Sequence, residues 1–103
     1  MYHPLVSIII PTYNRVEYLK KAVESALSQT YPNIEILICD DCSTDATEQY
    51  VLETQLQHQE KLRYVRHPKN LGFVKNHHKA IFELAKGDLF FILGDDDELV
   101  NPE

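Results

Sequence analysis

The 103-residue sequence is long enough for one domain and no more. Hydrophobic residues make up 44% of it and charged residues 25%, so a packed core is expected and intrinsic disorder is not. The 16 acidic and 10 basic residues give a formal net charge of −6. A field of that sign repels a phosphate backbone, so nucleic acid is not an expected partner.

The sequence carries no sign of export or of a membrane span. No apolar run approaches the ~20 residues that cross a bilayer, and residues 1–4 lack the basic and apolar regions of a signal peptide. Cys39 and Cys42 form a C-x-x-C pair, but no second pair exists to complete a structural zinc site. Cys39 also lies inside an aliphatic run, where a cysteine behaves as a small hydrophobic residue. The two cysteines therefore indicate a reducing, cytoplasmic setting without a disulfide.

Four short aliphatic runs predict the strands of a buried sheet. They cover residues 5–10, 34–39, 62–66 and 89–93. Nearly continuous runs of this kind suit strands that are buried on both faces, as in a parallel sheet covered by helices.

Helical patterns separate these strands. In the first pattern the apolar residues share one face, namely Leu19, Ala22, Val23, Ala26 and Leu27. Asn14, with Glu17 three residues later, predicts a capping box at the start of this helix. The second pattern begins near Asp45, and either Asp45 or Ser43 is expected to be its N-cap.

The third helical pattern places four residues on one apolar stripe, namely Val74, His77, Ile81 and Leu84. It ends at Gly87, which is the expected C-cap. His77 is accordingly interpreted as a packed histidine rather than a ligand.

The alternation of strands and helices predicts an α/β domain, with a mainly parallel sheet of about four strands and three helices. Parallel strands point the same way, so the segments that follow them meet at one edge of the sheet. The most polar segments of the chain fall there, at residues 12–15, 40–41, 67–72 and 95–97. Ligands of open α/β sheets bind at this carboxyl edge, so the candidate site is placed there.

An acidic run follows the last predicted strand, at Asp95, Asp96, Asp97 and Glu98. Four adjacent carboxylates repel one another unless a cation or water screens them. Oxygen ligands of this kind suit Mg²⁺ or Mn²⁺, which would share its coordination shell with phosphates. An isolated acidic run would be interpreted as a solvated turn, but the position of this one at the carboxyl edge favours a metal site.

Two other polar segments are candidates for ligand binding. Asp40 and Asp41 end the second strand, where a carboxylate can accept hydrogen bonds from a ribose or a base. Since Asp45 or Ser43 fills the N-cap, Asp41 is expected to be free for a ligand. The turn at residues 70–72 precedes a helix and offers unpaired N–H groups to an anion, and several basic side chains lie near it or across the cleft: Lys69, Lys75, Lys79 and Arg15. The alternative for this turn is a plain loop with surface lysines.

Taken together, these segments resemble the family 2 glycosyltransferases. Residues 6–15 (VSIIIPTYNR) and 26–36 (ALSQTYPNIEI) resemble the opening of that family, and residues 40–45 (DDCSTD) resemble its D-D-x-S-x-D segment. Asn70-Leu71-Gly72, the segment 85–88 (AKGD) and the triple aspartate follow in the family's order and spacing. The resemblance covers essentially the whole chain.

The resemblance implies a Rossmann-like GT-A fold, of which residues 1–103 form the nucleotide-sugar-binding half, truncated before the acceptor-binding part. It implies a nucleoside-diphosphate sugar donor, with UDP- or dTDP-sugars expected, and a glycan or lipid-linked acceptor in polysaccharide or cell-envelope synthesis. It also implies inversion at the anomeric carbon and a divalent cation, Mn²⁺ or Mg²⁺. The full-length protein is expected in the cytoplasm, at the inner face of the membrane.

The resemblance also assigns roles to residues of this chain. Four residues, Pro11, Thr12, Tyr13 and Arg15, would flank the nucleoside, and Asp41 would contact the base. Lys75 would belong to the same donor site, and Asp96 would lie near the ribose and the donor sugar. Asp95 and Asp97 would form the D-x-D pair, with Asp97 as the direct metal ligand.

The chain departs from the family pattern in two places. Many members carry an Arg-Asn pair early in the third helix, where this chain has His78-Lys79. Members also continue well beyond residue 103, into a region that holds the general base. No residue here matches that base, so this chain alone is expected to be inactive.

Two other hypotheses belong to different classes of protein. A phosphorylated receiver module would need an acceptor Asp after a middle strand, but His67-Pro68 follows the strand at 62–66. A folded but inactive assembly module would associate through the uncovered surface of a half-domain, so a homodimer or larger species is expected.

Overall fold

The computed structural model describes residues 3–94. Its elements follow in the order β1 (Val6–Thr12), α1 (Val16–Leu27), β2 (Ile34–Asp40), α2 (Thr47–Gln57), β3 (Leu62–Arg66), α3 (Phe73–Lys79), the π-helical turn η1 (Ala80–Leu84) and β4 (Leu89–Ile92). The predicted alternation of four strands and three helices is therefore confirmed.

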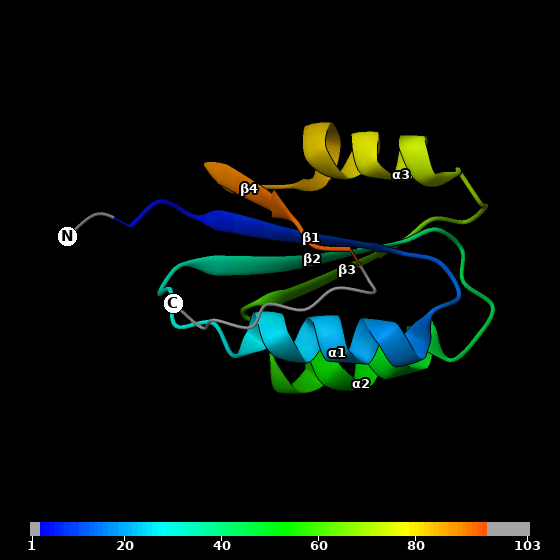
Figure 1. The fold of residues 1–103 in the computed structure, drawn as a ribbon, viewed down its shortest axis with the longest axis horizontal. Coiled ribbons are helices and arrows are strands. Elements are labelled where there is room, and N and C mark those ends of the chain that lie inside the picture. Colours follow the sequence, from blue (N-terminus) through cyan, green and yellow to red (C-terminus); the bar gives the residue numbers. More distant parts are fainter. Residues whose placement is uncertain (1–2, 95–103) are drawn as a thin grey trace.

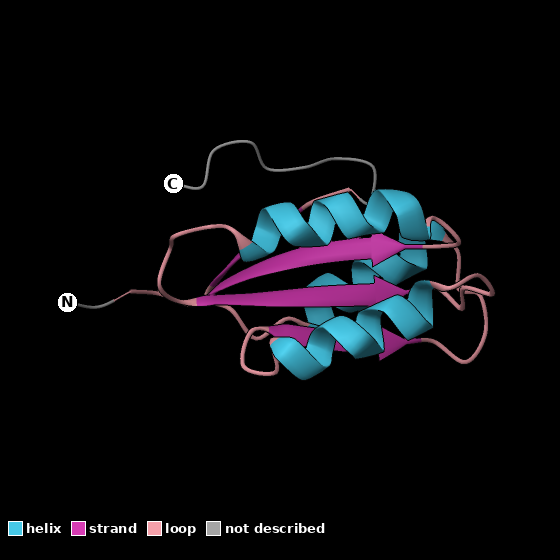
Figure 2. Ribbon diagram, turned by 90° about the horizontal axis from the view of Figure 1, so that it is seen from below, coloured by secondary structure: helices cyan, strands magenta, loops and turns pink. Residues whose placement is uncertain are grey.

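The four strands form one parallel sheet in the order β3-β2-β1-β4. β1 pairs with β2 from Val6 opposite Ile34 to Thr12 opposite Asp40, and β4 pairs with the other side of β1. Helices α1 and α2 cover one face of the sheet and α3 covers the other (Figure 1). All the strand arrows point the same way, so the loops that follow them gather at one edge (Figure 2).

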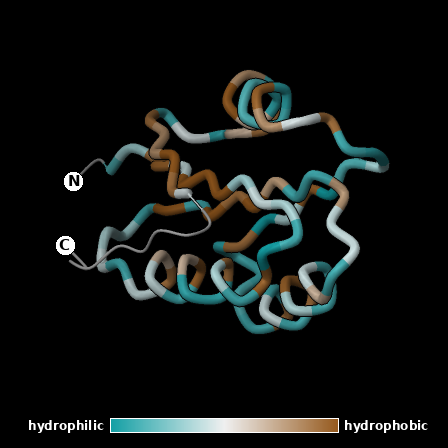
Figure 3. Tube along the Cα trace, turned by 45° about the vertical axis from the view of Figure 1, so that its right-hand side comes forward, coloured by the Kyte–Doolittle hydropathy of each residue, from teal (hydrophilic) through white to brown (hydrophobic). Residues whose placement is uncertain are grey.

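The core is split between the two faces of the sheet, because successive strand residues point to opposite sides. Ile8 and Ile10 of β1 belong to the cluster under α1 and α2, whereas Ile9 between them packs with Ala80 on the α3 side. Hydrophobic positions accordingly gather along the central strands (Figure 3). The expected apolar face of α1 is buried at Leu19, Ala22, Val23 and Ala26. None of the helices within residues 3–94 is both long and apolar enough to cross a membrane.

The last strand differs from the prediction that every strand is buried on both faces. β4 is one of the two outer strands of the sheet formed by the described residues, and the side chains of Leu89 to Ile92 are all exposed in it. A continuous apolar run predicts a strand, but it does not say how many neighbours that strand has.

The predicted caps of all three helices are wrong. The N-cap of α1 is Arg15, without a side-chain hydrogen bond, because Asn14 has a positive φ of 51° and uses its side chain elsewhere. The third helix ends at Leu84 and its C-cap is Ala85, so Gly87 is not the cap. In the second helix the N-cap is Ala46, rather than Asp45 or Ser43, although the Asp45 carboxylate accepts the N–H of Thr47, the first helical residue, at 3.0 Å.

The predicted apolar stripe of the third helix is correct only in its second half, where Ile81 and Leu84 pack against the core. Val74 is 76% exposed, whereas Asn76 and Ala80 are buried. The helix changes from α to π at Ala80, so a single period of 3.6 residues does not describe its buried face. His77 is only partly buried and does not belong to the core.

A buried polar cluster ties the amino ends of the strands to the segment before β4. The carboxylate of Glu35 accepts hydrogen bonds from Ser7 Oγ, from Arg63 Nη1 and, at 2.8 Å, from the N–H of Lys86. Ser7 Oγ in turn accepts the N–H of Gly87 at 2.8 Å. Burial opposes ionisation of Glu35, but the hydrogen bonds from Ser7, Lys86 and Arg63 outweigh it and lower its pKa.

Gly87 fits this cluster because it lacks a side chain. A Cβ at this position would lie 2.5 Å from Ser7 Oγ and 2.7 Å from the carbonyl oxygen of Leu89. Gly87→Ala should therefore lower the free energy of unfolding by about 1–3 kcal/mol through overpacking. Urea unfolding followed by circular dichroism would measure it. Lys86→Ala is the matched control, because it leaves the backbone N–H to Glu35 in place, and equal stability of the two variants would contradict the packing argument.

The lowered pKa of Glu35 predicts a dependence of stability on acid. A group whose pKa is lower in the folded state stabilises the fold above its ordinary pKa, here 4.5, and loses that contribution as the pH falls through the folded value. Glu35→Gln should therefore show a smaller loss of unfolding free energy than the parent chain between neutral pH and pH values below 4.5. Urea titrations at stepped pH would test this, and parallel pH profiles for the two proteins would refute it.

Candidate functional site

An open pocket with a volume of about 580 Å³ lies at the carboxyl edge of the sheet, where the sequence placed the site. Pockets of this size suit small-molecule ligands and cofactors. Its lining residues come from the end of β1, from the loops after β1, β2 and β3, from α3 and from the segment after β4: Pro11, Thr12, Tyr13, Arg15, Asp41, Asn70, Gly72, Phe73, Asn76, His77 and Gly94. The first five were predicted from the sequence.

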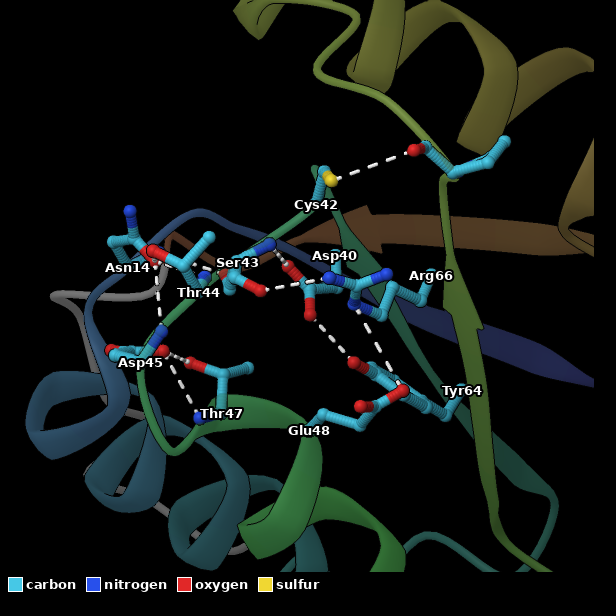
Figure 4. A network of polar contacts seen from close by, with 11 residues as sticks. Asn14, Asp40, Cys42, Ser43, Thr44, Asp45, Thr47, Glu48, Tyr64 and Arg66 are labelled. Atoms are coloured by element: carbon cyan, nitrogen blue, oxygen red, sulfur yellow. Dashed lines mark hydrogen bonds and ion pairs between the residues drawn. The ribbon is translucent and has the colours of Figure 1, made fainter.

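The loops after β1 and β2 are joined by Asn14 (Figure 4). Its side-chain oxygen accepts the N–H groups of Thr44 at 2.7 Å and Asp45 at 3.3 Å, while its own N–H donates to Ser43 Oγ at 2.8 Å. Asp45 completes the junction by accepting the N–H of Val16 at 3.2 Å. Because Asn14 stands between Tyr13 and Arg15, these bonds fix the backbone that carries both residues to the pocket.

Asp45 is held in its charged form by this junction. Burial acts in the opposite direction, but hydrogen bonds from the hydroxyl and N–H of Thr47 and from the N–H of Val16 outweigh it and lower the pKa of Asp45. Asp45 thus accepts backbone hydrogen bonds from the first residues of both α1 and α2.

Asp40 has a structural role at the end of β2. It is fully buried, and its carboxylate accepts the N–H of Ser43 at 2.9 Å and the hydroxyl of Tyr64 (Figure 4). Burial, and then the hydrogen bond to Asp40, raise the pKa of Tyr64, so this hydroxyl remains a donor. The two adjacent aspartates therefore have different roles: Asp40 stabilises the loop after β2, and Asp41 lines the pocket.

Asp41 is not free in the way the sequence predicted. It is only 4% exposed, and its two carboxylate oxygens accept the backbone N–H groups of Leu71 and Gly72, the latter at 2.9 Å. These are N–H groups of the turn that was expected to offer donors to an anion. The prediction of a free helix terminus is therefore wrong for Leu71 and Gly72, since the anion they bind is Asp41 itself.

Asn76 fastens α3 to the sheet. Its amide donates to the carbonyl of Cys39 at 3.0 Å and its oxygen contacts His67 Nε2 at 2.8 Å, and all three residues are buried. Because an amide oxygen can only accept, His67 Nε2 carries the proton. Burial raises the pKa of Cys39 to about 12, so this cysteine stays a neutral thiol in the core, as its position in a strand run predicted.

The pocket residues that sequence reasoning missed come mostly from the start of α3. Phe73, Asn76 and His77 were assigned no ligand, because the α3 stripe was predicted from a regular period that the helix does not follow. The only signal for them was their position directly after the Asn70-Leu71-Gly72 turn. Lys75 is exposed and is not among the lining residues, so its role in the donor site stays a prediction.

The three aspartates predicted to bind the donor and the metal, Asp95, Asp96 and Asp97, lie outside the described residues. Within residues 3–94 no group of three His, Cys, Asp or Glu side chains could hold a metal ion. The residue that precedes the acidic run, Gly94, does line the pocket. Its position is set by β4, since the N–H of Leu93 donates to the carbonyl of Ile9 at 2.9 Å.

The fold and the pocket define a Rossmann-like α/β domain with a ligand site at the carboxyl edge of a parallel sheet. The family described as "Glycosyl transferase family 2" matches residues 7–103. The chain therefore belongs to glycosyl transferase family 2, and the resemblance found in its motifs is confirmed.

Two curated relatives illustrate the match. The glycosyltransferase TuaG of Bacillus subtilis, whose name refers to teichuronic acid biosynthesis, is 38% identical over 95 residues, which cover 92% of this chain and 37% of TuaG. Chondroitin synthase of Escherichia coli is 39% identical over 102 residues, which cover 97% of this chain and 14% of the synthase. The chain thus spans well under half of the length of either relative.

Solved structures agree on the fold. The mannosyltransferase PcManGT of Pyrobaculum calidifontis, in complex with GDP-Man and Mn²⁺, is 26% identical with a TM-score of 0.88, and the match covers 98% of this chain and 30% of that one. TarS of S. aureus (fragment 1-349), in complex with UDP-GlcNAc, is 30% identical with a TM-score of 0.80, and that match covers 91% of this chain and 27% of TarS. The GT-A fold predicted for this chain is therefore confirmed.

The junction at Asn14 generates a prediction. Asn14→Ala removes its side-chain hydrogen bonds and forces an Ala to adopt a positive φ, so the free energy of unfolding should fall by about 2–4 kcal/mol. Asn14→Gly is the matched variant, because it loses the same bonds but tolerates the backbone conformation, and its loss should be about 1 kcal/mol smaller. Urea unfolding would measure both, and an unchanged stability in Asn14→Gly would show that the side-chain bonds are dispensable.

Proposed function

We propose that this chain supplies the donor- and metal-binding half of an inverting, divalent-metal-dependent transferase. The enzyme would move a sugar from a nucleoside-diphosphate sugar to a glycan or lipid-linked acceptor in cell-envelope synthesis. The observation that carries the proposal is the shared pocket, in which five residues predicted to bind the donor lie together with Gly94, directly before the acidic run.

Similar proteins support the class of ligand. PcManGT is described in complex with GDP-Man and Mn²⁺, and TarS in complex with UDP-GlcNAc. For this chain we propose a UDP- or dTDP-sugar, bound with its nucleoside against Tyr13 and Asp41. The Arg15 guanidinium would bring positive charge to the diphosphate in a chain whose net charge is −6.

The residues after Gly94 fit a divalent cation by their donor chemistry. Asp95 and Asp97 would hold it, because carboxylate oxygens are the ligands that Mg²⁺ and Mn²⁺ prefer. When bound, the cation would neutralise charge on the diphosphate leaving group. Asp96 would lie near the ribose and the donor sugar. The general base is expected in the part of a longer protein that follows residue 103, so the chain alone would bind the donor without transferring its sugar.

The proposal predicts metal-dependent nucleotide binding. Isothermal titration of the chain with UDP, dTDP and GDP should show binding in the presence of Mn²⁺ or Mg²⁺ that is lost when the metal is chelated. Asp97→Ala should abolish the gain from metal by removing its direct ligand. Glu60→Ala is the matched control, because Glu60 is an exposed carboxylate outside the pocket lining.

Two results would contradict the proposal. The first is equal affinity for nucleotide with and without metal, in a chain that circular dichroism shows to be folded. This result would mean that no cation takes part in nucleotide binding. Release of free sugar or a transferred product by these 103 residues alone would show that the missing base is not needed.

A further inference from the structure

An exposed aromatic ring lies at the pocket against a second ring. Phe73 is 76% exposed, yet it lines the pocket together with His77. The two rings lie 4.0 Å apart between centroids with 41° between their planes. His77 Nδ1 also contacts the carbonyl oxygen of Phe73 at 2.9 Å, and because a carbonyl can only accept, Nδ1 is the donor. The hydrogen bond thus holds the His77 ring to the backbone of Phe73, and the Phe73 ring lies against the His77 ring.

The helix that carries this ring pair is fixed to the sheet on the inner side. Gly72, directly before Phe73, donates its N–H to Asp41, and Asn76, directly before His77, is bonded to Cys39 and His67. Each ring therefore follows an anchored residue. An exposed aromatic surface on an anchored backbone is preorganised for a flat ligand, because less conformational freedom is lost when that ligand binds.

The ring pair belongs to α3, whereas Tyr13 belongs to the loop between β1 and α1. α3 lies on one face, and α1, with the loop that joins it to β1, lies on the other (Figure 1). Tyr13 is 47% exposed and lines the same pocket. Asp41 stands at the end of β2, and its carboxylate is one residue from Phe73 through the bond from Gly72.

We propose that the Phe73–His77 ring pair is the stacking surface for the nucleobase of the donor nucleotide. This inference rests on the proposed function, because it identifies which wall of the donor pocket contacts the base. A base that contacts Asp41 would lie beside the ring pair, since the carboxylate and Phe73 are joined through one backbone N–H. The diphosphate and sugar would lie toward Gly94, from which the acidic run continues. Phe73 is accordingly a determinant of how tightly the nucleotide binds, rather than a residue of the transfer step.

The test compares ligands that contain the base with a ligand that lacks it. The probes are UDP and UDP-GlcNAc, and inorganic pyrophosphate as the baseless probe, each titrated calorimetrically with Mn²⁺ present. Phe73→Ala should weaken UDP binding roughly 10- to 100-fold, the range of base–aromatic stacking, and leave pyrophosphate binding unchanged. Phe73→Tyr keeps a ring and should restore most of the affinity. His77→Ala releases the Phe73 ring and should cause a smaller loss than Phe73→Ala.

Val74→Ala is the matched control, because Val74 is as exposed as Phe73, stands next to it on α3 and does not line the pocket. It should bind all three ligands as the parent chain does. Unchanged UDP affinity in Phe73→Ala would overturn the inference. If only UDP-GlcNAc loses affinity relative to UDP, the ring pair stacks on the sugar and the base assignment is wrong.

The experiment also separates this inference from the proposed function. Metal-dependent UDP binding by the parent chain that is indifferent to Phe73 would leave the proposed function standing and overturn the inference alone. A parent chain that binds neither UDP nor pyrophosphate would overturn both. Equal losses of UDP and pyrophosphate in Phe73→Ala would mean that the variant disturbs the whole pocket, which also contradicts a surface that contacts only the base.

Discussion

The bond between the Asp41 carboxylate and the backbone of Leu71 and Gly72 determines the shape of the pocket. β2 is a central strand, and α3 begins at the next residue after Gly72. A carboxylate that is only 4% exposed would be costly without partners, and these two N–H groups supply them. These N–H groups lie at the start of a helix, where backbone donors have no partner within the helix. The two hydrogen bonds therefore give partners both to the carboxylate and to the N–H groups. These bonds place α3 over the edge of the sheet, where Phe73, Asn76 and His77 become lining residues.

The opposite wall depends on a similar bond in a different loop. Asn14 occupies a left-handed conformation that asparagine tolerates better than most residues, and it bonds with the loop after β2. The two aspartates at the end of β2 therefore work in opposite directions. Asp40 holds its own loop through Ser43 and Tyr64, on the side of α2, whereas Asp41 holds the start of α3. One strand end thus positions both walls of the pocket.

The sequence was sufficient to predict the strands, their parallel arrangement and the five pocket residues at and after the ends of β1 and β2. These depend on local signals, namely aliphatic runs that end at polar turns. The errors concern Asn14, Asp41, Gly87 and α3, where contacts distant in sequence decide the outcome. Asn14 bonds with residues about thirty positions later, so its local fit to a capping box did not matter. In α3 the change from α to π at Ala80 shifted the buried face, and no local pattern announces such a change.

The two ends of the sheet are coupled through β4. At the amino ends, Glu35, Ser7 and Gly87 fix where the chain leaves the third helix and joins β1. β4 then runs beside β1 in a register that begins with Leu89 opposite Val6, and this register determines that Gly94 reaches the pocket. Register in a sheet is all or nothing, because a shift of one residue turns every side chain to the other face. Glu35, a buried residue at the other edge of the sheet, therefore helps to shape the pocket. Its hydrogen bond with the segment before β4 supports the register that brings Gly94 to the pocket.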